Sequence, residues 1–396
     1  MQTPTAHTRR RLLGAAAVTI AAGGLGLAGS AALRLRTSPS GEAPMSDSST
    51  EATPSGLPGF VRSFVHRVAG DPSVLPVEGP LPAFTGATGW LNADPLTPEG
   101  LRGRVVLIDF WTYTCVNWLR TLPYVRAWDA KYADQGLTTI GVHTPEFAFE
   151  HDVANIVAQV HALRVPYPIA VDSDSGVWSA FDNHYWPAVY LADAEGRIRY
   201  HHFGEGEYAM TEMVIQQLLV EAGAQDVALD LVAVAPVGLE VAADYPTLRS
   251  PESYLGYGQA TGMASPDGLQ ADQPYDYTAP PRLGLNEWAP TGGWAISARA
   301  ATATAANARL AFRFQARDVN LVMGPAVRGT AIPFRVSLDG QPASGAVGTD
   351  VAADGTGRVA EQRTYQLIRQ PGPITERTFE IAFREPGVET FCFTFG

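Results

Sequence analysis

The chain has 396 residues, a formal net charge of -12 and 46% hydrophobic residues. Its length predicts about two domains with additional segments. The acidic charge argues against a nucleic-acid partner, which would require a basic surface. The two cysteines, Cys115 and Cys392, are too few for a disulfide framework or a cysteine-rich zinc site. We therefore expect no nucleic-acid partner, no metal site and no bound cofactor.

Residues 1–36 have the layout of an export signal. Three arginines at 9–11 precede a Gly- and Ala-rich apolar run that carries no charge before Arg34. The Arg9–Arg10 pair resembles the twin-arginine form of such signals. Small residues at 29–32 offer a cleavage site, although the run is also about long enough for an uncleaved membrane anchor. We expect an extracytoplasmic protein, in the periplasm, in the cell envelope or secreted, where disulfides persist.

Two segments separate this signal from the first predicted domain. Residues 37–58 are rich in Ser, Thr, Pro and Gly and predict a flexible linker. Apolar residues at helical spacing within 59–77 predict a short amphipathic helix. Together, residues 37–77 are expected to form a linker with a short helix.

Residues 78–235 alternate strand and helix patterns. The apolar runs at 104–111 and 137–144 predict buried strands, and each is followed by a helical pattern. Later residues predict a short strand, a hairpin that turns near 194–196, and a closing helix. This order indicates an α/β domain with a mixed sheet.

Five stretches of this domain carry a family resemblance: "FWTYTC", "RTLPYVRAW", "IGVHTPEFAFE", "YWPAVYLAD" and "HFGEGEY". The segment resembles extracytoplasmic thioredoxin-like and redoxin domains, most closely the soluble part of DipZ-type proteins. The resemblance implies a thioredoxin-like fold and a nucleophilic cysteine. Cys115 occupies the nucleophile position, at the start of a helix whose free N–H groups stabilise a thiolate. The alternative is a buried, inert cysteine.

The resemblance also implies roles for residues around Cys115. Asp109 matches the buried acid that moves protons, and Pro187 matches a proline that is cis and lies opposite the nucleophile. His143 follows the second strand and is a candidate proton partner of Cys115, because histidine titrates near neutral pH. A satisfied loop histidine is the alternative. The side chains expected to face the substrate are Thr114, Asn117, Trp118, Trp186 and Glu146.

Trp118 stands where a C-x-x-C motif would place its second cysteine. A dithiol enzyme resolves its mixed disulfide with that cysteine, so a disulfide shuttle within 115–118 is excluded. A single thiolate can still attack a disulfide, a sulfenate or a peroxide, and it then needs an external thiol. Thr112 matches the peroxiredoxin pattern, but Ile108 stands where those enzymes have proline.

Residues 236–396 change to short alternating strand patterns broken by Gly, Pro and Asp, which predict an all-β sandwich. Three stretches, "SPESYLGYG", "FQARDVNLVM" and "FTFG", resemble the jelly-roll-like module of DipZ-type proteins, which is similar to carbohydrate-binding modules. Alternation predicts that Phe391, Phe393 and Phe395 share one face and that Cys392 points to the other. Cys392 is expected to be a packing cysteine, with a bridge to Cys115 as the alternative.

We expect an exported thiol oxidoreductase or thiol-dependent antioxidant protein that acts in cell redox homeostasis. Its expected partners are extracytoplasmic thiol or disulfide proteins, small thiols, and a membrane electron donor. The alternative is a redox-silent binding protein whose sandwich holds a glycan or cell-wall ligand. Its candidate sugar-stacking residues are Tyr254, Tyr257, Tyr275, Tyr277, Trp288 and Trp294. We expect His184, His201 and His202 to be structural, and Glu205 and Glu207 to be solvated or to rim the site.

Overall fold

The computed structural model of the protein describes residues 75–396. The predicted export signal of residues 1–36, and nearly all of the predicted linker and helix of residues 37–77, lie outside this part of the chain. Among residues 75–396, no helix is both long enough and apolar enough to span a bilayer.

A seven-stranded mixed sheet forms the first domain, in the order β1-β7-β6-β3-β4-β5-β2. The central strands β3, β4 and β5 run parallel to one another, and β6 joins the sheet antiparallel to β3. Every residue of β3 is buried, as expected for a strand covered on both faces. The strands are β1 (Gly79–Pro80), β2 (Gly89–Leu91), β3 (Val105–Trp111), β4 (Leu137–His143), β5 (Ile169–Val171), β6 (Ala188–Ala192) and β7 (Arg197–Phe203).

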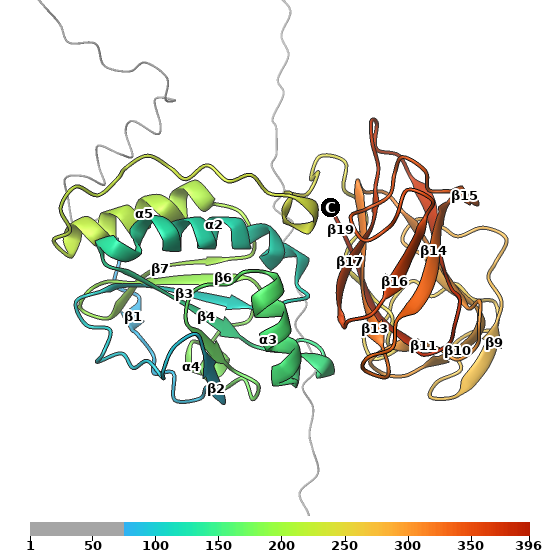
Figure 1. The fold of residues 1–396 in the computed structure, drawn as a ribbon, viewed down its shortest axis with the longest axis horizontal. Coiled ribbons are helices and arrows are strands. Elements are labelled where there is room, and N and C mark those ends of the chain that lie inside the picture. The colour runs from blue at the N-terminus through green and yellow to red at the C-terminus, as the bar shows by residue number, and fades with distance from the viewer. Residues whose placement is uncertain (1–74) are drawn as a thin grey trace, which may run out of the picture. The chain divides into compact units, whose positions relative to one another are not determined.

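Helices cover both faces of this sheet (Figure 1). They are α2 (Val116–Tyr132), α3 (Val153–Ala162), α4 (Gly176–Ala180) and α5 (Tyr208–Glu221). The apolar side chains of α2, α3 and α5 pack in one cluster with Val105 and Leu107 of β3. Residues Val106 and Ile108 point to the opposite cluster, which includes Val177 of α4. The alternation of β3 therefore distributes its side chains between two apolar layers.

The second domain is all β, with twelve strands in one antiparallel network that encloses its own apolar core. The strands are β8 (Ser253–Tyr254), β9 (Pro274–Tyr277), β10 (Trp288–Ile296), β11 (Ala301–Ala303), β12 (Arg309–Phe314), β13 (Asp318–Pro325), β14 (Ile332–Leu338), β15 (Gln341–Pro342), β16 (Thr356–Val359), β17 (Arg363–Arg369), β18 (Arg377–Phe383) and β19 (Val388–Phe395). The prediction of a thioredoxin-like α/β domain followed by an all-β sandwich is confirmed. The jelly-roll connectivity and the boundary at 235/236 stay predictions.

Side chains of both domains share one packed cluster. Phe391 of β19 packs on Phe149 and Phe147, with ring centroids 4.8 and 5.5 Å apart. Val322 of β13 and Cys392 of β19 belong to the same cluster as the helices α2 and α5. The all-β domain is thus in direct contact with the segments around Cys115.

Candidate active site

Cys115 is the N-cap residue of α2, with an extended backbone at φ −68° and ψ 109°. The turn of residues 112–114 carries the chain from the end of β3 to this position, and the Cys115 N–H donates to the Thr112 carbonyl at 3.2 Å. The thiol is partly buried and unpaired. Backbone N–H groups of Trp118 and Asn117 favour its thiolate, as a helix N-terminus should.

The net effect on the Cys115 thiol opposes the contribution of the helix N-terminus. Burial raises the pKa of Cys115, and the nearby Glu146 carboxylate raises it further, which together outweigh the backbone N–H groups. The sequence indicated a helix N-terminus that stabilises a thiolate. That contribution is less than about one pKa unit, and burial opposes it more strongly.

Trp118 fills the position of the missing second cysteine and is completely buried. Its indole N–H donates a hydrogen bond to Asp109 Oδ2 at 2.8 Å. Its ring stacks on Trp111, with centroids 4.2 Å apart and planes inclined by 24°. The expectation that Trp118 faces the substrate is therefore wrong for this structure, because the side chain is part of the core.

Asp109 is completely buried within β3. Burial raises its pKa from 3.8 to about 7, and the hydrogen bond from Trp118 opposes this shift. An acid with such a pKa can hold or release a proton near neutral pH. The sequence position of Asp109 suggested proton transfer, but its partner Trp118 was not foreseen.

His143, the last residue of β4, is paired with Trp111 in the parallel ladder. Its ring lies against Trp111 and Tyr113, with centroid distances of 4.9 and 5.6 Å. Burial lowers the pKa of His143 to about 3, and neither ring nitrogen has a hydrogen-bond partner. An imidazole with so low a pKa is uncharged near neutral pH, and the role of His143 as a proton partner of Cys115 stays a prediction.

Glu146 is the ionisable group that acts most strongly on Cys115. Burial, followed by the charge of Glu252, raises the pKa of Glu146 to about 8. The hydroxyl of Tyr254, in β8, donates a short hydrogen bond to Glu146 Oε1 and contacts Glu252 Oε2 at 3.3 Å. Two residues of the all-β domain thus complete the surroundings of the thiol. From the sequence, Tyr254 was a candidate sugar-stacking residue and Glu252 had no predicted role.

Thr114 anchors the turn before Cys115 and does not face solvent. It is buried, and its hydroxyl donates to Glu150 Oε1 at 2.7 Å. Its carbonyl accepts a hydrogen bond of 2.7 Å from Thr364 Oγ1, in β17 of the other domain. The expectation that Thr114 faces the substrate is wrong for this structure, because its hydroxyl and its carbonyl are both engaged internally.

Trp186 and Asn117 are the remaining residues expected at the substrate surface, and both are half-buried. Trp186 packs on Trp178, with ring centroids 4.4 Å apart. The peptide bond between Trp186 and Pro187 is cis, as the family resemblance implies. Strand β6 begins directly after Pro187, and its Ala188 pairs with Phe110 of β3. Pro187 therefore lies at the same end of the sheet as the turn that leads to Cys115.

Three of the predicted peripheral residues, Glu205, His201 and His184, have ionic or hydrogen-bond partners. Glu205 forms an ion pair with Arg120 at 2.9 Å, with both side chains nearly buried, rather than lying on a solvated face. His201 Nδ1 lies 2.7 Å from Glu78. Within residues 75–396, no group of three or more His, Cys, Asp or Glu side chains has the arrangement of a metal site.

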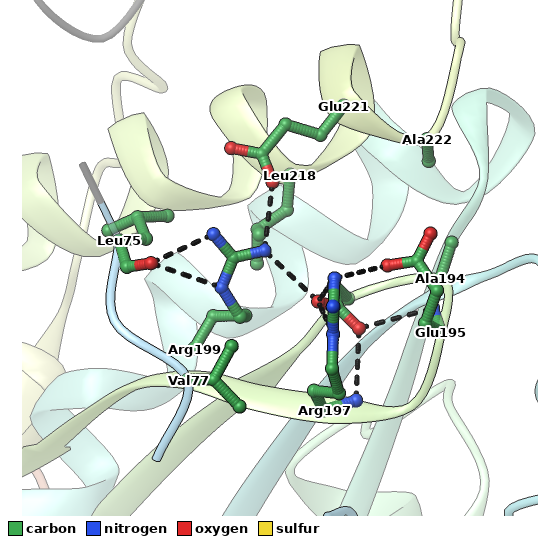
Figure 2. Close-up of a pocket in the computed structure, with 10 residues that line it drawn as sticks. Leu75, Val77, Ala194, Glu195, Arg197, Arg199, Leu218, Glu221 and Ala222 are labelled. Atoms are coloured by element: carbon green, nitrogen blue, oxygen red, sulfur yellow. Dashed lines mark hydrogen bonds and ion pairs between the residues drawn. The ribbon is translucent and has the colours of Figure 1, made fainter. Parts of the chain in front are cut away.

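A separate cavity of about 470 Å³ lies between β7 and the end of α5 (Figure 2). Its polar wall is a network of ion pairs, in which Arg199 contacts Asp193 and Glu221, both at 3.0 Å. None of the predicted site residues lines this cavity. We regard the network as structural, because each arginine is paired with carboxylates of the same network.

Three of the six candidate sugar-stacking residues belong to the core of the all-β domain. Tyr277, Trp288 and Trp294 are fully buried, so they cannot stack on a glycan. Tyr257 and Tyr275 are 36% and 38% exposed. The alternation of the strands had left open which aromatic side chains face inward, and packing places half of this set in the core.

Comparison with known proteins agrees with the two-domain architecture. Residues 76–218 match the Redoxin family, and residues 250–396 match the family described as "Thioredoxin like C-terminal domain". Protein DipZ of Mycobacterium tuberculosis is 36% identical over 325 residues, which cover 80% of this chain and 43% of DipZ. The chain therefore spans less than half of that relative.

Two smaller proteins match the first domain alone. The thiol-disulfide oxidoreductase YkuV of Bacillus subtilis is 32% identical over 147 residues, or 37% of this chain and 99% of YkuV. A solved thioredoxin-like protein in its oxidized form is 33% identical, covers 37% of this chain and 97% of its own, and has a TM-score of 0.34. The chain belongs to the redoxin family of thioredoxin-like thiol–disulfide oxidoreductases. Within that family it is DipZ-like, since both of its domains are matched in the DipZ alignment.

Proposed function

We propose that this protein is an exported thiol oxidoreductase whose attacking nucleophile is Cys115. The observation that carries this proposal is the position of Cys115: a partly buried, free cysteine at the N-cap of α2, where the first backbone N–H groups of the helix favour a thiolate. The thiolate would attack one sulfur of a substrate disulfide, form a mixed disulfide and expel the other sulfur as a thiolate. Sulfenate and peroxide substrates are further proposed electrophiles.

Glu146 is the proposed proton acceptor for the thiol. An ionised Glu146 carboxylate disfavours the Cys115 thiolate by like-charge repulsion. If that carboxylate takes the thiol proton, the repulsion disappears at the moment the thiolate forms. The pKa of Glu146, about 8, makes it a stronger base than an ordinary carboxylate. Asp109 is the proposed internal proton store, and Pro187 and Trp186 are the proposed edge on which an extended substrate segment pairs.

Export through a twin-arginine signal is part of the same proposal, based on the sequence of residues 1–36. The expected partners are thiol or disulfide proteins or small thiols of the periplasm, cell envelope or secreted space. A membrane electron donor would restore the reduced state.

The alternative is a redox-silent protein that holds a glycan or cell-envelope partner. One observation favours it, namely the raised pKa of Cys115, which makes the thiol a slow nucleophile. The burial of Tyr277, Trp288 and Trp294 weighs against the glycan part of this alternative.

An assay that follows the reduction of a protein disulfide, with a small thiol as the electron source, distinguishes the thiol oxidoreductase from the redox-silent binding protein. The wild-type chain should accelerate the reduction, and Cys115→Ser should remove the acceleration, because serine cannot form the mixed disulfide. A matched control is Ser253→Ala. This variant removes a buried hydroxyl of the all-β domain, next to Tyr254 in β8, and leaves the Cys115 thiol intact. No acceleration by the wild type would support the redox-silent alternative, and equal acceleration by the wild type and Cys115→Ser would exclude Cys115 as the nucleophile.

A further inference from the structure

Cys392 lies on the face of the all-β domain that packs against the redoxin domain. Sequence alternation predicted that Phe391 shares a face with Phe393 and Phe395. Instead, the register between β13 and β19 shifts, with Val322 opposite Cys392 and Met323 opposite Thr390. This bulge leaves Phe391 unpaired, so Phe391 and Cys392 both belong to the cluster shared by the two domains. Phe393 and Phe395 belong to the core of the all-β domain.

Cys392 belongs to a row of four residues that are paired across neighbouring strands. One end of this row contacts the turn of residues 112–114 before Cys115. Thr364 of β17 pairs with Val322 of β13, which pairs with Cys392 of β19, which pairs with Tyr254 of β8. Directly paired residues of antiparallel strands point to the same face of a sheet. All four side chains are therefore directed to the same side, where Val322 and Cys392 join the cluster of the redoxin domain.

Both ends of this row are held by the segments that surround Cys115. At one end, Thr364 donates to the carbonyl of Thr114, the residue directly before Cys115, at 2.7 Å. At the other end, Tyr254 donates to Glu146. Neighbouring strands are about 4.8 Å apart, so the backbone of Cys392 lies about two strand spacings from that of Thr364 and one from that of Tyr254. The row therefore places Cys392 between the two residues that bind the segments around Cys115.

Electrostatics agrees with this placement. Burial raises the pKa of Cys392, and Glu252, Glu146 and Cys115 each raise it further. The charge of Glu146 and of Glu252 also acts on Cys115. Two thiols that respond to the same two carboxylates occupy one electrostatic environment.

We propose that Cys392 is the resolving cysteine of this protein, supplied by the second domain in place of the thiol that Trp118 replaces. This inference rests on the proposed function of Cys115 as nucleophile. The Cys115 thiolate attacks a substrate disulfide, and a mixed disulfide forms as the first substrate thiolate leaves. The Cys392 thiolate then attacks the Cys115 sulfur, the second substrate thiolate leaves, and a Cys115–Cys392 disulfide remains.

The step is balanced without another oxidant. The substrate disulfide gains two electrons and becomes two thiols, and the two protein thiols lose two electrons and become one disulfide. The two protons of the protein thiols pass to the released thiolates. In the structure both cysteines are free, which corresponds to the reduced state. A disulfide requires Cα atoms about 4.4–6.8 Å apart, so the proposed bridge would fix the separation between β19 and the start of α2 in the oxidised protein.

The full chain, reduced and freed of reductant, is mixed with the chromogenic disulfide dithiobis-nitrobenzoate under native conditions. Released chromophore is counted, and the protein is then measured by intact mass and by non-reducing peptide mapping. We expect about two equivalents of chromophore, no retained adduct, and a cross-linked peptide pair containing Cys115 and Cys392. Cys392→Ala should release one equivalent and keep the adduct on Cys115. Val327→Ala is the matched control, because Val327 is an exposed side chain of the same domain that lies outside this row, and it should still release two equivalents.

The outcomes separate the two proposals. One equivalent from the wild type with a stable adduct on Cys115 would leave Cys115 as nucleophile and overturn the role of Cys392. Two equivalents with two retained adducts would also overturn it, because the two thiols would have reacted independently. No release from the native wild type would overturn the proposed function itself. The decisive measurement is made on the wild type, so it does not depend on whether Cys392→Ala folds.

Discussion

Replacing Asp109 with asparagine should remove a pH-dependent loss of stability from the redoxin domain. Burial raises the pKa of Asp109 from 3.8 to about 7, so the folded protein holds the proton more tightly than the unfolded chain does. The stabilisation from this proton is fully present below the unfolded pKa of 3.8 and is lost as the pH rises through 7. The side-chain amide of the Asp109→Asn variant stays neutral throughout and can still accept the hydrogen bond from Trp118.

The size of this stability change follows from the shift in the pKa of Asp109. A change of about three pKa units corresponds to roughly 4 kcal/mol at about 1.4 kcal/mol per unit. Part of this stabilisation is already lost by about pH 5. The wild type should therefore lose about 2–3 kcal/mol of unfolding free energy, through ionisation of Asp109, between about pH 5 and pH 8. Because Asp109 is completely buried, solvent screening does not reduce this figure much.

Urea unfolding at both pH values measures the free energy of unfolding of the wild type and of Asp109→Asn. The fall in stability from about pH 5 to pH 8 should be about 2–3 kcal/mol smaller in the variant. Asp354→Asn is the control, since the pKa of Asp354 lies below its ordinary value and the group is ionised throughout this range. An identical pH dependence of the wild type and Asp109→Asn would show that burial does not dominate the titration of this carboxyl.

Two further predictions concern the thiol and the export signal. Glu146→Gln should lower the pKa of Cys115 and speed its alkylation by iodoacetamide at about pH 9, by up to about tenfold for each unit of decrease. Glu252→Gln should have a smaller effect, because its charge is the weaker influence on Cys115; equal effects, or none, would contradict this order. Arg9→Lys combined with Arg10→Lys should retain the precursor inside the cell, because a receptor recognises the pair. Normal export of the double variant, measured by cell fractionation, would exclude the twin-arginine assignment.

Local features of the site followed from the sequence because they depend on neighbouring residues. A buried strand that ends at Trp111 and a helical pattern after Cys115 predicted the N-cap position of the thiol. The absence of a thiol at position 118 is a fact of the sequence. The strands of the second domain also followed from their alternation, although alternation could not foresee the bulge that turns Phe391 toward the redoxin domain.

Contacts between distant residues were decided by the tertiary structure alone. The hydrogen bond between Tyr254 and Glu146 joins residues 108 positions apart, and the one between Thr364 and Thr114 joins residues 250 positions apart. The sequence predicted a reactive thiolate because it revealed the helix end beside Cys115. It could not reveal burial or the carboxylate of Glu146, which depend on how segments pack in space. Desolvation is set by all the atoms around a group, and those atoms come from both domains, so the protonation of Cys115 could be decided only by the folded chain.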